Sequence, residues 1–155
     1  MPPDAPFVPP SFDPPRSLSG PGFVLEPLGP QHNDRDYAAW TSSMDHIRAT
    51  PGFTDSDWPH DMSPDENLGD LERHARDFSD RTGFTYTVLD PEDAAVIGCV
   101  YIYPLAEEPG AQVRSWVRAD RAELDVPLAQ AVAGWLGADW PLERVTYRGR
   151  PSLSR

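Results

Sequence analysis

Apolar residues alternate along some stretches of the chain and recur at helical spacing along others. Five short runs rich in aromatic and β-branched residues are typical of strands, at 23–28, 84–89, 95–103, 113–117 and 145–147. Helix-periodic apolar residues occupy the long interval after the first run and the interval between the last two. This order predicts an α/β (α+β) fold in which helices flank a mixed, mostly antiparallel five-strand sheet.

Local signals indicate where the helices begin and which side chains they bury. The run 63–66, Ser-Pro-Asp-Glu, offers a capping serine, a proline at the first position and acids in the first turn. Asn33 and Asp125 are expected to cap an earlier and a later helix, and 41–43 leaves the earlier one as a single helix or two short ones. Gly98, inside the third strand, indicates a bulge or a close backbone approach. Ten apolar residues are expected to be mostly buried: Tyr37, Trp40, Leu71, Phe78, Val96, Ile97, Val100, Ile102, Val132 and Trp135.

The chain divides into a Pro-rich N-terminal arm at 1–22, a domain at 23–148 and a polar tail at 149–155. Proline lacks an amide donor and fixes φ, so regular structure is not expected in the arm. Three apolar residues favour an arm docked on a surface over a disordered one: Phe7, Val8 and Phe12.

The last predicted strand, 145–147, leaves one edge of the sheet bare. Bare edges invite association with other chains. We therefore expect this edge to be covered by the arm or paired with a second copy in a homodimer.

Composition narrows the classes of partner. The net charge is -12, and all 13 Lys and Arg positions are arginine. Nucleic acids and anionic membranes both need a basic surface, so neither is expected, whereas a basic or amine-bearing partner would suit; acidity that serves solubility is the simpler account. Cys99 is the single cysteine and lies in an apolar run, which predicts a buried thiol and excludes an intramolecular disulfide. Without a basic leader or an apolar run of roughly 20 residues, a cytoplasmic protein is expected.

A hairpin, a strand and a helix in the second half of the chain carry a family resemblance. The hairpin 85–103 has Asp-Pro at its turn and Val-Ile-Gly at 96–98, and a strand ending at Val117 leads through an Arg-containing loop into a helix. This arrangement resembles the GNAT superfamily of acetyl-CoA-dependent N-acyltransferases over residues 23–147. The resemblance implies direct transfer of an acetyl group from acetyl-CoA to a small-molecule or peptide amine, with the thioester near 115–117.

In that family the loop after the fourth strand reads Q/R-x-x-G-x-G/A, and its amides cradle the cofactor's pyrophosphate at a helix N-terminus. Here Leu124 and Val126 stand where small residues belong, while Glu123 and Asp125 add negative charge. Two interpretations stay open: an acetyltransferase with weakened acetyl-CoA binding, or a catalytically inactive GNAT-like binding or structural module. The resemblance assigns cofactor contacts to Trp116, Val117, Arg118, Arg121, Ala122 and Glu123.

Candidates for the acceptor site and for catalysis are fewer. In the family the segment between the first two helices borders the acceptor site, and a packing role is equally compatible with the aromatic residues found there. No residue matches the family's proton-donating tyrosine, because the chain ends shortly after Tyr147. The four histidines lack metal-ligand spacing, and His74 is expected at the surface or half-buried rather than as a ligand. The acceptor-site candidates are Phe53, Trp58, Tyr101 and Tyr103.

Overall fold

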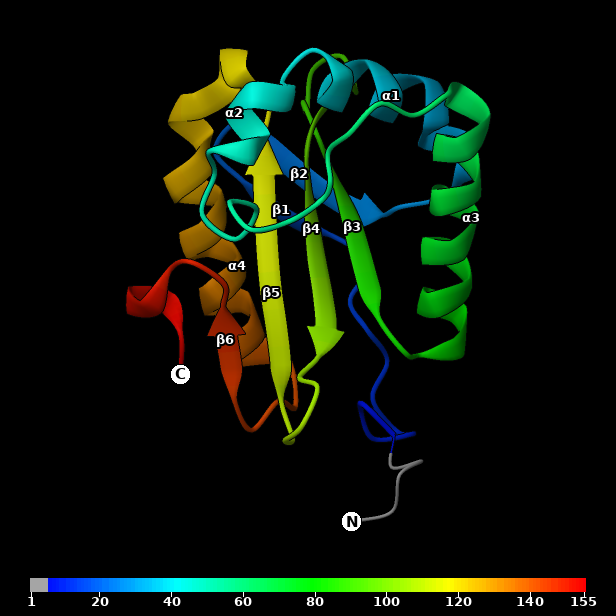
Figure 1. The fold of residues 1–155 in the computed structure, drawn as a ribbon. Helices are drawn as coiled ribbons and strands as arrows, with labels where there is room; N and C mark the ends of the chain where they lie inside the picture. Colours follow the sequence, from blue (N-terminus) through cyan, green and yellow to red (C-terminus); the bar gives the residue numbers. More distant parts are fainter. Residues whose placement is uncertain (1–5) are drawn as a thin grey trace.

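The computed structural model describes residues 6–155, so the first five residues of the predicted arm lie outside the described residues. One six-stranded sheet, in the order β1-β2-β3-β4-β5-β6, forms the centre of the molecule (Figure 1). Neighbouring strands are antiparallel except β5 and β6, which are parallel. The strands are β1 (Leu18–Gly20), β2 (Phe23–Pro27), β3 (Phe84–Leu89), β4 (Val96–Pro104), β5 (Ala111–Val117) and β6 (Val145–Tyr147).

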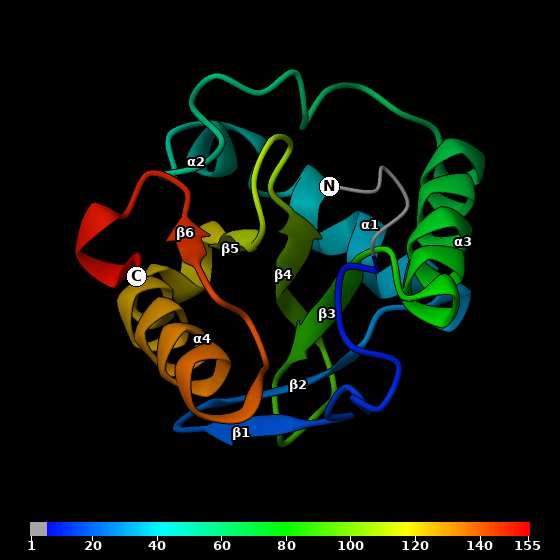
Figure 2. The same ribbon diagram turned by 90° about the horizontal axis from the view of Figure 1, so that it is seen from below.

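Helices cover both faces of this sheet (Figure 2). On one face α4 (Asp125–Asp139) packs with the arm, and on the other lie α1 (Asn33–Thr41), α2 (Met44–Arg48) and α3 (Pro64–Asp80). Short 3₁₀ turns, η1 (Pro30–His32), η2 (Ala119–Leu124) and η3 (Pro151–Leu153), complete the chain. Among residues 6–155, no helix is long and apolar enough to cross a membrane.

The strands bury alternate residues in two apolar layers. Val100 and Ile102 of β4 face α4, whereas Cys99 faces α1 and α3. Eight of the ten predicted core residues are buried, and Tyr37 and Phe78 are partly buried against the same clusters. The predicted core is therefore confirmed.

Gly98 has both properties that its place in the sequence indicates. The pairing of β3 with β4 shifts by one residue, because Val88 pairs with Gly98 while Leu89 pairs with Val96. A Cβ atom at Gly98 would collide with the carbonyl oxygen of Trp116 on β5. The missing side chain thus allows β4 and β5 to approach closely beside a bulge.

The predicted number of strands is wrong by one, since the arm contains β1. Its three residues pair with β2 across a turn at Gly22, where φ is +86°. Phe7 stacks on Phe84 with 5.8 Å between ring centroids, Val8 is buried, and Phe12 packs against Trp140. These apolar contacts dock the arm on the domain. Its strand was not predicted because it has only three residues and is surrounded by prolines.

The expectation that the arm covers the edge at β6 is wrong, because the arm pairs with β2 instead. The C-terminal tail folds back along that edge: Arg155 N donates to the carbonyl oxygen of Val145 at 2.7 Å, and Tyr147 N donates to Ser154 Oγ at 2.9 Å. One of these bonds joins backbone atoms and the other uses a serine hydroxyl, so no apolar pattern in the tail indicates this role.

The structure confirms one of the three predicted helix caps. Ser63 Oγ accepts from Glu66 N at 3.1 Å and Ser63 N donates to Glu66 Oε1 at 2.9 Å, which confirms the α3 capping box. Asn33 does not cap α1, because His32 occupies that position and the Asn33 side chain donates to another helix. Asp125 does not cap α4 either: η2 runs directly into α4, and the Asp125 carboxylate accepts from Arg150 instead.

Candidate functional site

The two parallel strands β5 and β6 pair at one end only and then separate. Their register joins 111–113 to 145–147, and the last bond runs from Arg148 N to the carbonyl oxygen of Val113 at 2.8 Å. Arg118 N donates to β4, so the alternating backbone groups of Ser115 and Val117 point toward the side of β6. Beyond Val113 these groups line an opening between the two strands.

On the α4 face this opening is filled by the chain's own polar side chains. The hydroxyl groups of Tyr147 and Ser115 are hydrogen bonded at 2.6 Å, and both residues are buried. Burial raises the pKa of Tyr147 well above its ordinary value, so the phenol stays protonated at neutral pH. Arg150 lies 5.7 Å from the centre of the Tyr147 ring and donates to Asp125 Oδ1 at 2.8 Å. An internal ion pair therefore occupies the N-terminal end of α4.

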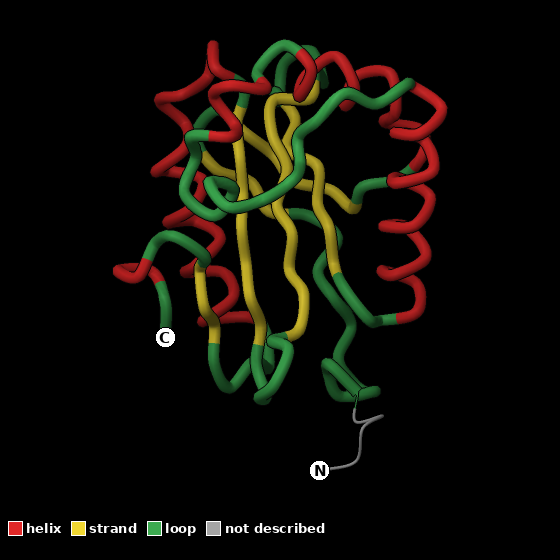
Figure 3. The backbone as a smooth tube through the Cα atoms, viewed as in Figure 1, coloured by secondary structure: helices red, strands yellow, loops and turns green. Residues whose placement is uncertain are grey.

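On the opposite face a loop closes the opening. Figure 3 shows the long loop between α2 and α3 running across the sheet. Gly52, at φ +96°, lies so close that an added Cβ would be 3.0 Å from the Arg148 carbonyl oxygen, and Gly149, at φ +75°, lies against Pro51 and Gly52. Arg114 of β5 contacts this loop from the sheet, with its guanidinium 4.6 Å from the centre of the Phe53 ring.

The two arginines of the loop after β5 are paired with carboxylates of the same chain. Arg118 binds Asp120 through Nε and Nη2, at 2.9 and 2.7 Å, and donates to the Val96 carbonyl oxygen. Arg121 Nη1 donates to Asp90 Oδ2 at 2.9 Å, in the turn between β3 and β4. The hydrogen bonds from Arg118 lower the pKa of Asp120. Both guanidinium groups are thus held on the β4 side of β5, away from the opening toward β6.

The remaining candidate cofactor residues divide between core and surface. Trp116 and Val117 are buried in opposite apolar layers, and Ala122 and Glu123 are exposed on η2. Amides of this turn bond internally, since Arg121 N donates to the Arg118 carbonyl oxygen and Asp125 N to that of Ala122. In this conformation the loop is poorly suited to a pyrophosphate, because two of its amides are already bonded within the turn and its two arginines are paired with carboxylates of the same chain.

Three of the four acceptor-site candidates come together on the α1 and α3 face. The ring centroids of Phe53, Trp58 and Tyr101 lie 6.0 to 6.4 Å apart. Trp116 Nε1 donates to the Tyr101 hydroxyl at 3.0 Å, which fixes the ring from the next strand. Tyr103 lies apart from this cluster, where its hydroxyl donates to Asp77 at 2.8 Å.

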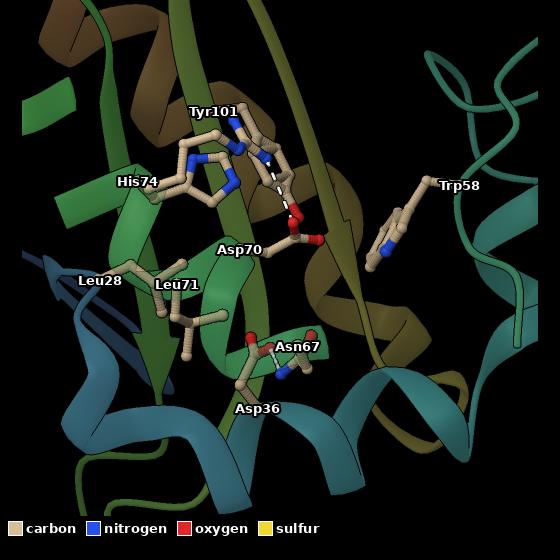
Figure 4. A pocket seen from close by; sticks show the side chains of 9 residues that line it. Leu28, Asp36, Trp58, Asn67, Asp70, Leu71, His74 and Tyr101 are labelled. Carbon is tan, nitrogen blue, oxygen red and sulfur yellow. Dashed lines mark hydrogen bonds and ion pairs between the residues drawn. The ribbon is translucent and has the colours of Figure 1, made fainter. Parts of the chain in front are cut away.

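Beside the cluster lies a cavity of about 220 Å³ between α1, α3 and β4 (Figure 4). Burial raises the pKa of Asp36, at its floor, to about 6, and the hydrogen bond from Asn67 opposes that rise. His74 Nδ1 lies 2.9 Å from the Tyr103 hydroxyl and 3.0 Å from Thr85 Oγ1. Burial lowers the pKa of His74 to about 4, so the ring is neutral at pH 7. The cavity is lined by Leu28, Asp36, Trp58, Asn67, Asp70, Leu71, Arg73, His74 and Tyr101.

Sequence analysis missed most of the polar lining of this cavity. In the sequence Asp36 resembles an ordinary acidic residue in the first turn of a helix, but in the structure its side chain is buried. Asn67, Asp70 and His74 follow one another at three and four residues, the spacing that places side chains on one face of a helix. That spacing, on the face that also carries Leu71, is the signal that could have found them. Within residues 6–155, no group of three or more His, Cys, Asp or Glu side chains could hold a metal ion.

Comparisons with known proteins agree on the fold. No protein-family model matches the chain, and neither does any curated protein sequence. The structure resembles ribosomal-protein-S5-alanine acetyltransferase from Vibrio fischeri, with a TM-score of 0.63 at 14% identity over 83% of this chain and 71% of that one. A candidate GNAT-family acetyltransferase from Bordetella pertussis gives 0.56 at 17% identity, over 84% and 76%.

A third solved structure that resembles the chain contains the family's cofactor. Microcin C7 self immunity acetyltransferase MccE, in complex with acetyl-CoA and AMP, gives a TM-score of 0.62 at 10% identity, over 81% of this chain and 68% of that one. At these identities the likeness concerns the fold. The mixed sheet and its flanking helices are therefore those of the GNAT acetyltransferase fold.

Proposed function

We propose that this chain is a GNAT-fold binding module that does not transfer acetyl groups from acetyl-CoA. The observation that carries the proposal is the set of internal ion pairs around the expected cofactor site. Arg118, Arg121 and Arg150 each donate to a carboxylate of the same chain, at 2.7 to 2.9 Å. Among residues 6–155, these three arginines near the N-terminus of α4 are therefore already engaged with the chain's own carboxylates.

The exchange of partners that cofactor binding would require supports the same conclusion. Each of these ion pairs would have to break before its arginine could turn to the cofactor. An incoming diphosphate would also meet the carboxylates of Asp120, Glu123 and Asp125. The exchange replaces formed ion pairs by similar ones and adds repulsion, so binding is expected to be weak.

The second candidate function is acetyl transfer from acetyl-CoA to a small-molecule or peptide amine. It is favoured by the fold and by the backbone groups of Ser115 and Val117, which face the opening between β5 and β6. In this alternative Arg150 and the loop at Gly52 would have to move to admit a cofactor, and the acidic surface would attract a cationic acceptor. For either function we propose a cytoplasmic location. We also propose that neither a nucleic acid nor a membrane is a partner, because the net charge is -12.

Calorimetric titration with acetyl-CoA separates the two candidates. We expect no binding, or a dissociation constant weaker than about 1 mM, which corresponds to about -4 kcal/mol. Arg150→Ala, which removes the arginine that pairs with Asp125, is a matched variant and is also expected not to bind. A low-micromolar constant for the unmodified chain, about -8 kcal/mol, would overturn the proposal in favour of acetyl transfer. Tight binding by the Arg150→Ala variant alone would refute the reasoning from the loop.

A further inference from the structure

Segment 6–17, the part of the arm that precedes β1, lies beside β3 without forming a helix or a strand (Figure 2). It is rich in proline, which has no amide hydrogen to donate. Among residues 6–155, its backbone forms no hydrogen bond with the backbone of the domain, and the bond from Phe12 N to the Pro9 carbonyl oxygen stays inside the segment. Contacts that involve side chains therefore hold the segment on the domain.

The domain surface beneath this segment combines aromatic rings with one arginine. The rings come from the C-terminal end of α3, from β3 and from the residue that ends α4. They form a continuous row, because each ring centroid lies 5.0 to 5.5 Å from that of a neighbour in the row. The arm-binding surface is defined by five residues that each contact segment 6–17: Phe78, Arg81, Phe84, Tyr86 and Trp140.

Polar side chains of this surface bind the backbone of the segment and not its side chains. Arg81 Nη2 donates to the carbonyl oxygens of Pro9 and Phe12, at 2.8 and 2.7 Å. The Tyr86 hydroxyl donates to the Pro15 carbonyl oxygen at 2.8 Å. Any extended chain presents such carbonyl groups. Aromatic rings combined with donors to backbone carbonyl groups are the chemistry by which proteins recognise proline-rich ligands.

One donor of the arm-binding surface has no acceptor while the arm is in place. The Trp140 ring packs against Phe12, with 5.1 Å between ring centroids. Its Nε1 atom is buried and has no hydrogen-bond partner within residues 6–155. A buried donor without an acceptor is unfavourable, so segment 6–17 leaves the hydrogen bonding of this surface incomplete. A ligand that brings a carbonyl oxygen to this N–H would form one bond more than the arm does.

We propose that the arm-binding surface is a docking site for an extended, proline-rich segment of a partner protein, and that segment 6–17 occupies it until the partner displaces the arm. The partner segment carries two aromatic residues at the spacing of Phe7 and Phe12, with prolines around them. Because the arm is tethered, it competes at a high effective concentration, and the partner must bind more tightly than the arm does. The unpaired Trp140 N–H offers the partner such an advantage.

This proposal goes beyond the binding role proposed above and is independent of acetyl-CoA. The arm-binding surface lies at the C-terminal ends of α3 and α4, whereas the loop expected to hold the cofactor precedes the N-terminal end of α4. Either proposal can therefore fail without the other.

Synthetic peptides test the proposal on the full-length chain. The probe peptide has the sequence of residues 6–17 with alanine at its polar positions, and the control peptide has serine in place of both phenylalanines as well. The protein is the Phe7→Ser/Phe12→Ser variant, whose own arm competes less. By fluorescence anisotropy we expect this variant to bind the probe at least tenfold more tightly than the control peptide. The unmodified chain should bind the probe at least tenfold more weakly than the variant does.

Further substitutions in this variant assign the binding to the surface. Arg81→Met removes the donor to two carbonyl oxygens, and Tyr86→Phe removes the third donor while keeping the ring; each should weaken binding of the probe at least threefold. Arg76→Met replaces an exposed arginine of α3 and should leave the affinity unchanged. Equal binding of the probe and the control peptide, or equal affinities of the Arg81→Met and Arg76→Met proteins, would overturn the proposal.

A measurement on the unmodified chain decides the question if the double variant does not fold. Arg16 is exposed and lies next to Ser17, so trypsin should cut between them more readily once the segment leaves the surface. The probe contains no arginine and survives the protease. Excess probe should speed this cleavage at least threefold by mass spectrometry, whereas the control peptide should not. An unchanged rate would overturn the proposal, and so would a dimer of the unmodified chain that the probe dissociates, because the arm of a second copy would then be the occupant.

Discussion

Replacing Asp36 by Asn should stabilise the protein at neutral pH. Burial raises the pKa of Asp36 from 3.8 to about 6, and each pKa unit corresponds to about 1.4 kcal/mol. The ionised side chain therefore destabilises the folded state by about 3 kcal/mol at most. Asparagine avoids this cost because it is neutral and still accepts from Asn67, whose own partners, Asn33 and Trp40, stay in place.

The stability gained by Asp36→Asn should increase as pH rises. Because the folded pKa of Asp36 lies above the unfolded one, the folded protein binds more protons between pH 4 and 6, and stability falls as pH rises through this interval. The free-energy difference between Asp36→Asn and the unmodified chain should be near zero at pH 4 and reach about 1–3 kcal/mol by pH 7.5. For a domain of this size that corresponds to a rise in Tm of several degrees.

The other titratable groups near Asp36 do not produce the same dependence of stability on pH. Burial lowers the pKa of His74 from 6.5 to about 4, so its contribution to stability rises with pH over this interval, opposite to that of Asp36, and it cancels in the difference because both proteins contain it. Burial raises the pKa values of Cys99 and Tyr101, which stay protonated. Asp70 and Arg73 are common to both proteins and cancel in the difference.

Urea unfolding at pH 4, 5, 6 and 7.5 measures the effect. Asp34→Asn, an exposed acid in the same turn, is the control and should change stability by less than about 0.5 kcal/mol. An Asp36→Asn protein that is less stable than the unmodified chain at pH 7.5 would refute the reasoning. So would a difference that stays constant from pH 4 to pH 7.5.

Two further predictions concern the sheet. Deleting residues 151–155 exposes the outer edge of β6, so the shortened chain should associate with itself in a concentration-dependent way by analytical ultracentrifugation, while the full chain stays monomeric; a monomeric deletion variant would contradict this. Gly98→Ala should cost at least about 2 kcal/mol in urea unfolding, because its Cβ would collide with the Trp116 backbone. Gly134→Ala on α4, where nothing lies within 4 Å, should instead stabilise by about 0.5–1 kcal/mol, and equal effects of the two substitutions would count against the packing argument.

Much of the fold was predictable because its strands carry strong local patterns. The hairpin of β3 and β4 alternates large apolar residues over both strands, and Gly98 marks the one place where they deviate. The elements that sequence analysis missed have no such pattern. β1 has three residues between prolines, and the tail protects β6 through Arg155 N and Ser154 Oγ. Pairing through backbone atoms and a single serine hydroxyl leaves no apolar pattern in the sequence.

The candidate site was less predictable because its parts come from distant segments. Trp58 and Tyr101 were recognised as aromatic residues near an acceptor site, and the structure places them at one cavity. The role of Asp36 depends on Asn67, which is 31 residues away, and on the burial that α3 imposes. A carboxylate in the first turn of a helix is usually exposed, so only tertiary structure distinguishes this one.

Charged side chains are paired within the chain on one face of the sheet, and a carboxylate is buried without a cation on the other. Near the N-terminus of α4, Arg150 pairs with Asp125, and the guanidinium groups of the preceding loop pair with carboxylates of the same chain. On the other face, Asp36 is buried beneath aromatic rings without a cation. A charge neutralised inside the fold gives a ligand little to gain, whereas a buried charge without a partner lowers stability until a ligand supplies the opposite charge. Weak cofactor binding is therefore expected at the loop before α4, where the arginines are already paired with carboxylates of the same chain.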